Sequence, residues 1–168
     1  MSTATLEEEP REAAAAREVS EFLTFRLGRE EYGIDILQVQ EIRSCEEPTH
    51  MVGTPRFVRG VINLRGAIVP IIDLRIKLGC AQAEYGDFTV TIFLDIAGTT
   101  VGVVVDAVAD VVQLAQGQIR PAPRFEGQVD AAFVRGIASV DQRMLIVIDM
   151  QALLGASELG AIEAAAAV

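Results

Sequence analysis

The chain has 168 residues, of which 51% are hydrophobic, and it carries a net charge of −10. This length and apolar content suffice for one domain, or two small ones, with a proper core. The negative charge repels nucleic-acid phosphates and anionic lipid headgroups, and no run reaches the roughly 18 apolar residues of a membrane-spanning helix. We therefore expect a protein that binds no nucleic acid and does not insert into a membrane.

Residues 1–20 are acidic and lack the basic-then-apolar order of a secretion signal. No steady apolar face runs through them, so we expect a flexible acidic tail on a cytoplasmic protein. Short apolar runs begin at Phe22, and FLTFRL, GREEYG and IDILQVQEI together predict a hairpin over residues 22–42. A polar crossing that contains Pro48 and His50 follows this hairpin.

The second predicted hairpin is FVRGVINLRGAIVPIID, over residues 57–73. Its stretch from Asn63 to Gly66 suits the positive φ angles of a tight hairpin turn. Proline has no N–H to donate to a neighbouring strand, so Pro70 predicts an edge or bulged strand. After a linker, FTVTIFLDI and TTVGVVVDAV predict a third hairpin around Gly98.

A second polar crossing contains QIRPAP and leads to the last strand pair, FVRGIASV followed by RMLIVIDM. The alanine-rich residues 155–168 predict a helical tail, weakened by Gly155 and Gly160. The sequence thus alternates short strands with turns and polar crossings, and it has a helical pattern mainly at its end.

The chain contains an internal repeat. FVRG at residues 57–60 recurs at residues 133–136, an offset of 133 − 57 = 76, and the same offset pairs Asp73 with Asp149. Upstream, three pairs share an offset of 102 − 33 = 69: Gly33 with Gly102, Val39 with Val108, and Glu41 with Asp110. The repeat therefore covers most of each half of the chain.

Four or five short strands cannot bury both faces as an open sheet, whereas a small barrel hides the strand edges. The duplication therefore predicts two small barrels side by side. The seam between them should form an elongated apolar groove, where a binding protein usually takes its partner. A stripe of aliphatic residues has repeat-related members there, although such a stripe is also typical of a core: Val39, Ile42, Val108 and Val111.

Glu41 lies in the VQEIR strand, and Arg65 lies on the NLRG turn. An ion pair between them would fix the direction of the turn. The two residues are equally suited to contact a partner, and the sequence leaves both roles open.

The sequence shows no catalytic pattern. His50 is the one histidine and lies in a polar crossing, so we expect it on the surface. No nucleophile motif of a hydrolase and no glycine-rich phosphate loop occurs. Cys45 and Cys80 lie 80 − 45 = 35 positions apart, without the spacing of a metal site. We expect no catalytic residue, no metal and no cofactor.

Asp73 and Asp149 close the aliphatic runs of the two repeats at matching positions. Paired carboxylates are able to share proton transfer, so an acid–base enzyme that uses Asp73, Asp149 or Glu41 is one alternative. It would need a cleft with converging polar groups, which the repeat does not provide. We favour a turn or helix-cap role for the two aspartates.

Five stretches occur in one order with little insertion: EEYGIDILQVQEIR, TPRFVRGVINLRGAIVPIIDLR, VGVVVDAVADVV, QIRPAP and QRMLIVID. Together they closely resemble the CheW family of bacterial chemotaxis coupling proteins. The resemblance implies a mainly all-β protein with two SH3-like five-stranded β-barrel subdomains, packed side by side, and a short C-terminal helix. We expect a CheW-like domain at residues 21–154, with barrel halves at about 21–84 and 85–150 that exchange strands.

The resemblance also implies a non-enzymatic scaffold, recruited to receptor arrays, that couples the cytoplasmic tips of chemoreceptors (methyl-accepting chemotaxis proteins) to the histidine kinase CheA. It places the receptor tip in the groove between the barrels, at Val39, Glu41, Ile42, Gly60, Arg65, Gly102, Val108 and Val111. It places the SH3-like regulatory domain of CheA at Arg120 and Phe125. Repetition of these contacts, with the kinase or with further copies of the chain, predicts rings.

Two alternatives to this function remain open from the sequence. One is a CheW-like coupler that belongs to a chemosensory array with an output other than motility, and no residue separates it from the first. The other is a peptide-binding SH3-like module, which would need an aromatic-lined groove for proline-rich ligands. Two tyrosines and seven phenylalanines scattered along the chain do not favour such a groove.

Overall fold

The computed structural model describes residues 18–79, 86–121 and 133–154. The predicted acidic tail at residues 1–20 lies almost wholly outside the described residues, and so does the predicted helical tail at residues 155–168. The strands are β1 (Val19–Leu27), β2 (Glu30–Asp35), β3 (Val39–Ser44), β4 (Val58–Leu64), β5 (Ala67–Asp73), β6 (Val90–Ile96), β7 (Thr99–Val105), β8 (Ala107–Ala115), β9 (Val134–Val140) and β10 (Arg143–Ile148). The short helices are η1 (Ile36–Gln38), α3 (Leu74–Lys77), η2 (Gln116–Gln118) and α4 (Met150–Leu154).

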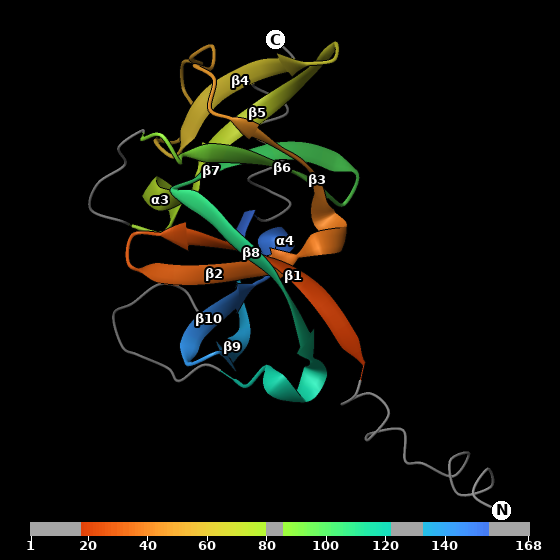
Figure 1. Ribbon diagram of the computed structural model, residues 1–168. Helices are drawn as coiled ribbons and strands as arrows, with labels where there is room; N and C mark the ends of the chain where they lie inside the picture. Colours follow the sequence, from red (N-terminus) through yellow and green to blue (C-terminus); the bar gives the residue numbers. More distant parts are fainter. Residues whose placement is uncertain (1–17, 80–85, 122–132, 155–168) are drawn as a thin grey trace, which may run out of the picture.

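The strands form two five-stranded sheets. Sheet A has the order β8-β1-β2-β10-β9, and sheet B has the order β3-β6-β7-β5-β4. Figure 1 shows sheet B in the upper part of the view and sheet A in the lower part. Sheet A combines the first two strands with the last three, so each sheet takes strands from both halves of the chain. The prediction of a mainly all-β protein with two five-stranded units is confirmed.

The internal repeat is present in the pairing of the strands. Parallel strands β5 and β7 pair Ile71 with Gly102, and parallel strands β10 and β2 pair Val147 with Gly33. These residues are related by the offsets of 76 and 69 found in the sequence. The two sheets are therefore built alike, although neither is continuous in the chain.

Each sheet has a β-bulge at the same place in the repeat. The register of β3 against β6 passes from Val39 to Glu41 and skips Gln40. The register of β8 against β1 passes from Val108 to Asp110 and skips Ala109. The offset between the two skipped residues is again 109 − 40 = 69. A bulge bends its strand and re-aims the side chains that follow it.

The largest hydrophobic cluster fills the space between the two sheets. Alternate residues of β1 contribute to it from sheet A, and alternate residues of β6 and β7 contribute from sheet B: Leu23, Phe25, Leu27, Ile92, Leu94, Ile96, Val101, Val103 and Val105. Two smaller clusters, around Phe22 and around Phe93, cover the other faces of sheets A and B. Because the seam is filled with core side chains, a partner is able to reach only its rim.

The barrels are completed by single bridges rather than by continuous ladders. Thr49, which follows β3, exchanges two hydrogen bonds of 2.9 Å with Val61 of β4. Arg120, which follows β8, does the same with Ile137 of β9. The architecture is thus consistent with SH3-like barrels whose strand order stays open in each sheet.

The prediction that Pro70 lies in an edge strand is wrong, because β5 is flanked by β7 and β4. The ladder between β5 and β7 begins at Ile71, one residue after the proline. The missing N–H of Pro70 therefore interrupts no ladder bond. A register shift does occur in this hairpin, between Val58 and Gly60 of β4.

Candidate functional site

The end strands β3 and β8 carry most of the residues that the sequence predicted for receptor binding. The four aliphatic residues among them form two repeat-related pairs that differ in exposure. Val39 and Val108 are partly buried and pack against the cluster between the sheets. Ile42 and Val111 are 42% and 45% exposed. The aliphatic stripe is therefore partly core and partly surface, and only its exposed members are available to a partner.

Glu41 and Arg65 form an ion pair between β3 and the β4–β5 turn. Arg65 Nη2 donates to Glu41 Oε2 at 2.8 Å. Arg65 has a positive φ of 54° and a side chain that is 78% exposed, whereas the Glu41 side chain is 23% exposed. Glu41 Oε1 is buried and has no hydrogen-bond partner in the described part of the chain. The pair ties the turn to the edge strand and leaves one carboxylate oxygen unsatisfied.

Gly60 and Gly102 are buried inside sheet B and offer no side chain to a partner. A Cβ atom on Gly60 would lie 2.1 Å from the carbonyl oxygen of Thr49. A Cβ atom on Gly102 would lie 2.6 Å from Cδ1 of Ile71 and 3.1 Å from Cε1 of Phe93. Both glycines are needed for close packing inside the barrel, so they act on any binding surface through the fold.

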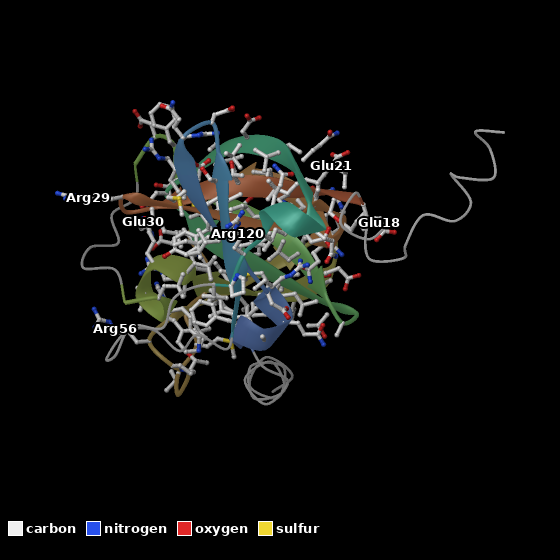
Figure 2. The ribbon with its side chains drawn as sticks, turned by 90° about the horizontal axis from the view of Figure 1, so that it is seen from below. Glu18, Glu21, Arg29, Glu30, Arg56 and Arg120 are labelled. Carbon is white, nitrogen blue, oxygen red and sulfur yellow. The ribbon has the colours of Figure 1, made fainter. Side chains whose placement is uncertain are left out.

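Arg120, predicted as a kinase contact, lies on a different face of the molecule. It is exposed beside a hollow of about 570 Å³ that is lined by Gly117, Gln118, Arg120, Pro121, Ile137, Ser139 and Met144. Figure 2 shows Arg120 near the centre of the molecule as seen from below, with Glu18 and Glu21 to one side and Arg29 to the other. Phe125, the second predicted kinase contact, lies outside the described residues.

The sequence analysis missed a buried ion network at the junction of the sheets. Arg75 is fully buried and donates through Nε and Nη2 to the two carboxylate oxygens of Asp73, both at 2.9 Å. Its Nη1 donates to Asp106 Oδ1 at 3.0 Å, and Asp106 Oδ2 accepts from the Gly28 amide at 2.7 Å. Asp106 lies between β7 of sheet B and β8 of sheet A. The network therefore joins the two sheets where the chain crosses between them.

Charge partners keep Arg75 protonated. Burial alone would lower the pKa of Arg75, but hydrogen bonds and charge attraction from Asp73, and then from Asp106, raise it above its ordinary value. One feature of the sequence could have indicated this network. Arg75 in LRIK follows an apolar run directly, and a charged residue that is buried with such a run needs an oppositely charged partner. The partner Asp106 is 31 residues away, and no local pattern identifies it.

The described residues form no catalytic arrangement. Asp73 accepts from the amide of Arg75 at 3.0 Å, and Asp149 accepts from the amide of Gln151 at 3.0 Å, so their predicted role as helix caps is confirmed. His50 is exposed, as predicted. Cys45 is a free thiol, and Cys80 lies outside the described residues. Within residues 18–79, 86–121 and 133–154, no three His, Cys, Asp or Glu side chains are grouped to hold a metal ion.

Comparison with known proteins gives a family match that spans most of the chain. The family model of the CheW-like domain matches residues 21–158. The chain belongs to the CheW-like family. The chemotaxis protein CheW of Klebsiella aerogenes is 48% identical over 143 residues, which cover 85% of this chain and 86% of that protein. Protein FrzA of Myxococcus xanthus is 32% identical over 145 residues, which cover 84% of this chain and 89% of FrzA.

A solved structure with a CheW-like domain has the same fold. It is the crystal structure of the scaffolding protein TtCheW from Thermoanaerobacter tengcongensis, with a TM-score of 0.77 and 35% identity. The match covers 84% of this chain and 96% of that one. The family resemblance seen in the sequence motifs is thereby confirmed. Family membership identifies the chain as a scaffold and coupling protein of chemotaxis and not as an enzyme.

Family members act through protein contacts, so the exposed surfaces of the CheW-like domain are the candidate sites. Among the helices of the described residues, none is long and apolar enough to cross a membrane. We take two candidate surfaces from the family resemblance and from the exposure of the side chains. We call the first the β3/β8 surface, defined by Ile42, Val111, Glu41 and Arg65. We call the second the β9 hollow, defined by the residues around Arg120 given above.

Proposed function

We propose that the chain couples the cytoplasmic tips of chemoreceptors to the histidine kinase CheA. In this proposal the receptor tip binds the β3/β8 surface, and the regulatory domain of the kinase contacts Arg120 and Phe125. The protein acts in the cytoplasm and is recruited to receptor arrays, where repeated contacts build rings. It contributes binding geometry and uses no cofactor.

The observation that carries the proposal is the exposure of apolar side chains at repeat-related strands of a CheW-like domain. Ile42 and Val111 are nearly half exposed, and Val111 lies next to the buried Val112 on β8. Apolar side chains presented by rigid strands are able to pack against the apolar face of a helix, which is the form that the family resemblance implies for the receptor tip.

The ion pair between Glu41 and Arg65 also supports the proposal that the β3/β8 surface binds the receptor tip. Arg65 remains 78% exposed while it holds Glu41, so its other guanidinium donors are available to a partner. Glu41 Oε1 is buried without a hydrogen bond among the described residues, and its other oxygen is held by Arg65, so Arg65 is the member of the pair that a partner is able to reach. A helix that combines apolar residues with a polar acceptor therefore suits this surface.

Weak single contacts are sufficient for such a coupler. Interfaces of about 1,000 Å² often bind only in the micromolar range, and simultaneous contacts in an array raise the effective affinity. Loss of one apolar side chain should therefore reduce assembly strongly while it leaves the fold intact.

The test compares two valine-to-aspartate substitutions. Val111→Asp places a charge on the β3/β8 surface, and Val52→Asp places the same charge at a valine that is 99% exposed in the loop after β3. Purified variants are mixed with CheA and receptor-containing membranes, and the bound fraction is measured by co-sedimentation. We expect Val111→Asp to weaken receptor binding about tenfold or more, because a charge in an apolar contact is costly.

Val52→Asp should bind like the wild type, and Ile42→Asp should behave like Val111→Asp. Urea unfolding of each variant verifies that the fold is retained. Receptor binding of Val111→Asp that equals that of Val52→Asp would contradict the assignment of the surface. Absence of binding to both receptor and kinase by the wild type would contradict the proposed function as a whole.

A further inference from the structure

The end strand β9 of sheet A presents backbone hydrogen-bonding groups that have no partner within residues 18–79, 86–121 and 133–154. Ile137 uses its N–H and C=O to bond Arg120, at 2.7 and 2.9 Å, on the side away from β10. Successive residues of a strand point these groups to opposite edges, so Ser139 directs its N–H and C=O to the same free edge as Ile137. No residue among those that the structure describes pairs with Ser139 at that edge.

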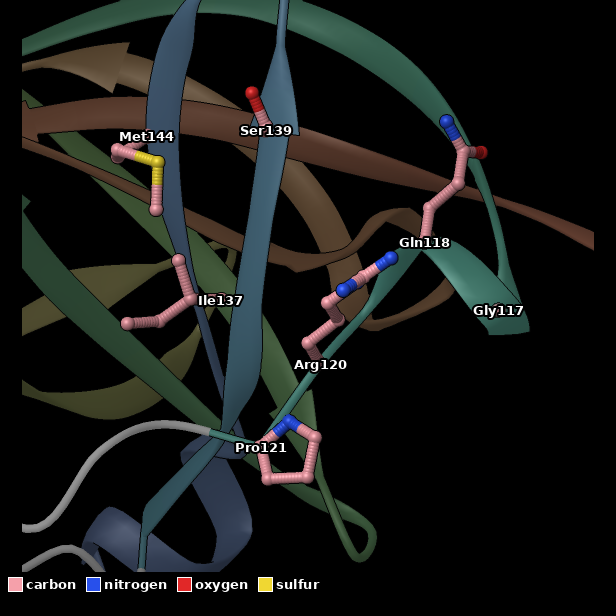
Figure 3. A pocket seen from close by; sticks show the side chains of 7 residues that line it. All are labelled: Gly117, Gln118, Arg120, Pro121, Ile137, Ser139 and Met144. Atoms are coloured by element: carbon pink, nitrogen blue, oxygen red, sulfur yellow. The ribbon is translucent and has the colours of Figure 1, made fainter.

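The gap opposite Ser139 exists because η2 turns the chain away. An antiparallel strand continued backward from Arg120 would place Gln118 opposite Ser139. Instead, residues Gln116–Gln118 form a 3₁₀ turn, in which Gln118 Oε1 accepts from the amide of Ala115 at 2.7 Å. Figure 3 shows Ser139 and Gln118 on opposite sides of the gap, with Arg120 and Pro121 below them. The β9 hollow is therefore the space of a missing strand segment.

The lining of the β9 hollow indicates what kind of segment fits. Met144 is 58% exposed on β10 and pairs with Ser139 in the register, and Ile137 adds a second apolar side chain. Arg120 supplies an exposed guanidinium, in a protein whose net charge is −10. Guanidinium groups bind carboxylates through paired, charge-assisted hydrogen bonds. Backbone donors and acceptors at a free sheet edge bind extended polypeptide.

We propose that the β9 hollow accepts an extended segment of a partner protein, which adds to sheet A as a short strand beside Ser139 and places a carboxylate against Arg120. The hollow, at about 570 Å³, has the size of sites that bind a few residues. The apolar side chain of the added segment packs on Met144. This inference rests on the proposed function only in that CheA serves as the partner to be tested.

The first experiment measures hydrogen exchange at the amide of Ser139, in the free chain and in its complex with full-length CheA. Strand addition converts this exposed N–H into a ladder hydrogen bond, so exchange should slow at least about tenfold in the complex. Slow exchange already in the free chain would overturn the proposal, because the edge would then be covered without a partner. Unchanged exchange in a complex that does form would overturn it as well.

The second experiment uses a matched pair of substitutions at one position. Ser139→Pro removes the edge N–H and leaves the β9–β10 ladder bonds in place, whereas Ser139→Ala removes only the hydroxyl and keeps the N–H. We expect Ser139→Pro to raise the Kd for CheA about tenfold and Ser139→Ala to leave it unchanged. Arg120→Glu should weaken binding at least as much, and the effect should shrink in high salt.

The outcomes separate this inference from the proposed function. Normal CheA binding by Ser139→Pro and Arg120→Glu would refute strand addition while the coupling function stands. Failure of the wild type to bind CheA at all would refute both. Urea unfolding shows whether Ser139→Pro is folded. If this variant does not fold, hydrogen exchange at Ser139 of the wild type decides whether a strand is added.

Discussion

Gly60 allows a direct test of whether a predicted binding residue acts through packing. Replacing it with alanine would place Cβ 2.1 Å from the carbonyl oxygen of Thr49, which is far inside van der Waals contact. The backbone must then separate, and the two hydrogen bonds of 2.9 Å between Thr49 and Val61 are lost. These bonds join the segment after β3 to β4, so the substitution should open the barrel of sheet B.

The expected magnitude follows from two contributions. Two backbone hydrogen bonds are worth about 1 kcal/mol each. Gly60 also has a φ of 143°, and a side chain in this region costs about 1–3 kcal/mol. We therefore expect Gly60→Ala to lower the free energy of unfolding by about 3–5 kcal/mol. This is a large part of the stability of an ordinary domain.

Equilibrium unfolding in urea measures this effect, with Gly28→Ala as the matched control. Gly28 has a φ of 63°, but no heavy atom lies within 4 Å of a Cβ placed there. Its substitution should cost only the backbone strain of about 1–2 kcal/mol. If the urea midpoint of Gly60→Ala falls no further than that of Gly28→Ala, the packing argument is wrong. Lost receptor binding by a Gly60→Ala protein of wild-type stability would instead favour a direct contact.

Two further predictions concern the ion pairs. Arg75→Met should lower the free energy of unfolding by about 3–5 kcal/mol, because it leaves the fully buried Asp73 without its cation. The pKa of Arg75 is raised in the folded protein, so its stabilising contribution is complete below its unfolded pKa and would be lost only as pH rises through the folded value. The difference between Arg75→Met and wild type in urea unfolding should therefore stay constant between about pH 6 and pH 9, and a contribution that disappears in this range would contradict the assignment. Arg65→Ala should change the free energy of unfolding by less than about 1 kcal/mol, because the Arg65 side chain is 78% exposed and water is able to replace it beside Glu41. If Arg65→Ala lowers the free energy of unfolding by several kcal/mol, the ion pair contributes far more to stability than its exposure indicates.

The strand pattern and the repeat could be predicted because both are local or periodic properties of the chain. The FVRG repeat and the aspartates that close each aliphatic run predicted related hairpins and helix caps, and Asp73 and Asp149 do cap α3 and α4. The turn at Asn63 to Gly66 was likewise placed correctly, although the positive φ angles fall at Arg65 and Gly66 while the Asn63 side chain accepts from the Gly66 amide. Such features depend on backbone sterics and on hydrogen bonds within a few residues.

The surface residues were harder to predict, because exposure depends on what packs against each strand. Val39 and Ile42 belong to one aliphatic stripe, yet Val39 packs against the core and Ile42 is 42% exposed. The register places both residues on the same face of sheet B, with Val39 opposite Leu94 and Ile42 opposite Ile92. Gly60 was expected in a groove and is instead buried against Thr49. Neither result follows from the spacing of apolar residues, because spacing assigns a face but not what covers each position on it.

The sequence by itself determined that the chain would form two related sets of short strands with turns at known places. The apolar alternation of each run and the residues of each turn restrict the backbone locally. The tertiary structure alone decided that β1 and β2 join β8, β9 and β10, and that the seam between the sheets is filled. It also decided that Asp106 meets Arg75, because pairing between distant segments depends on the summed burial of both sheets. No local pattern in one strand carries that information.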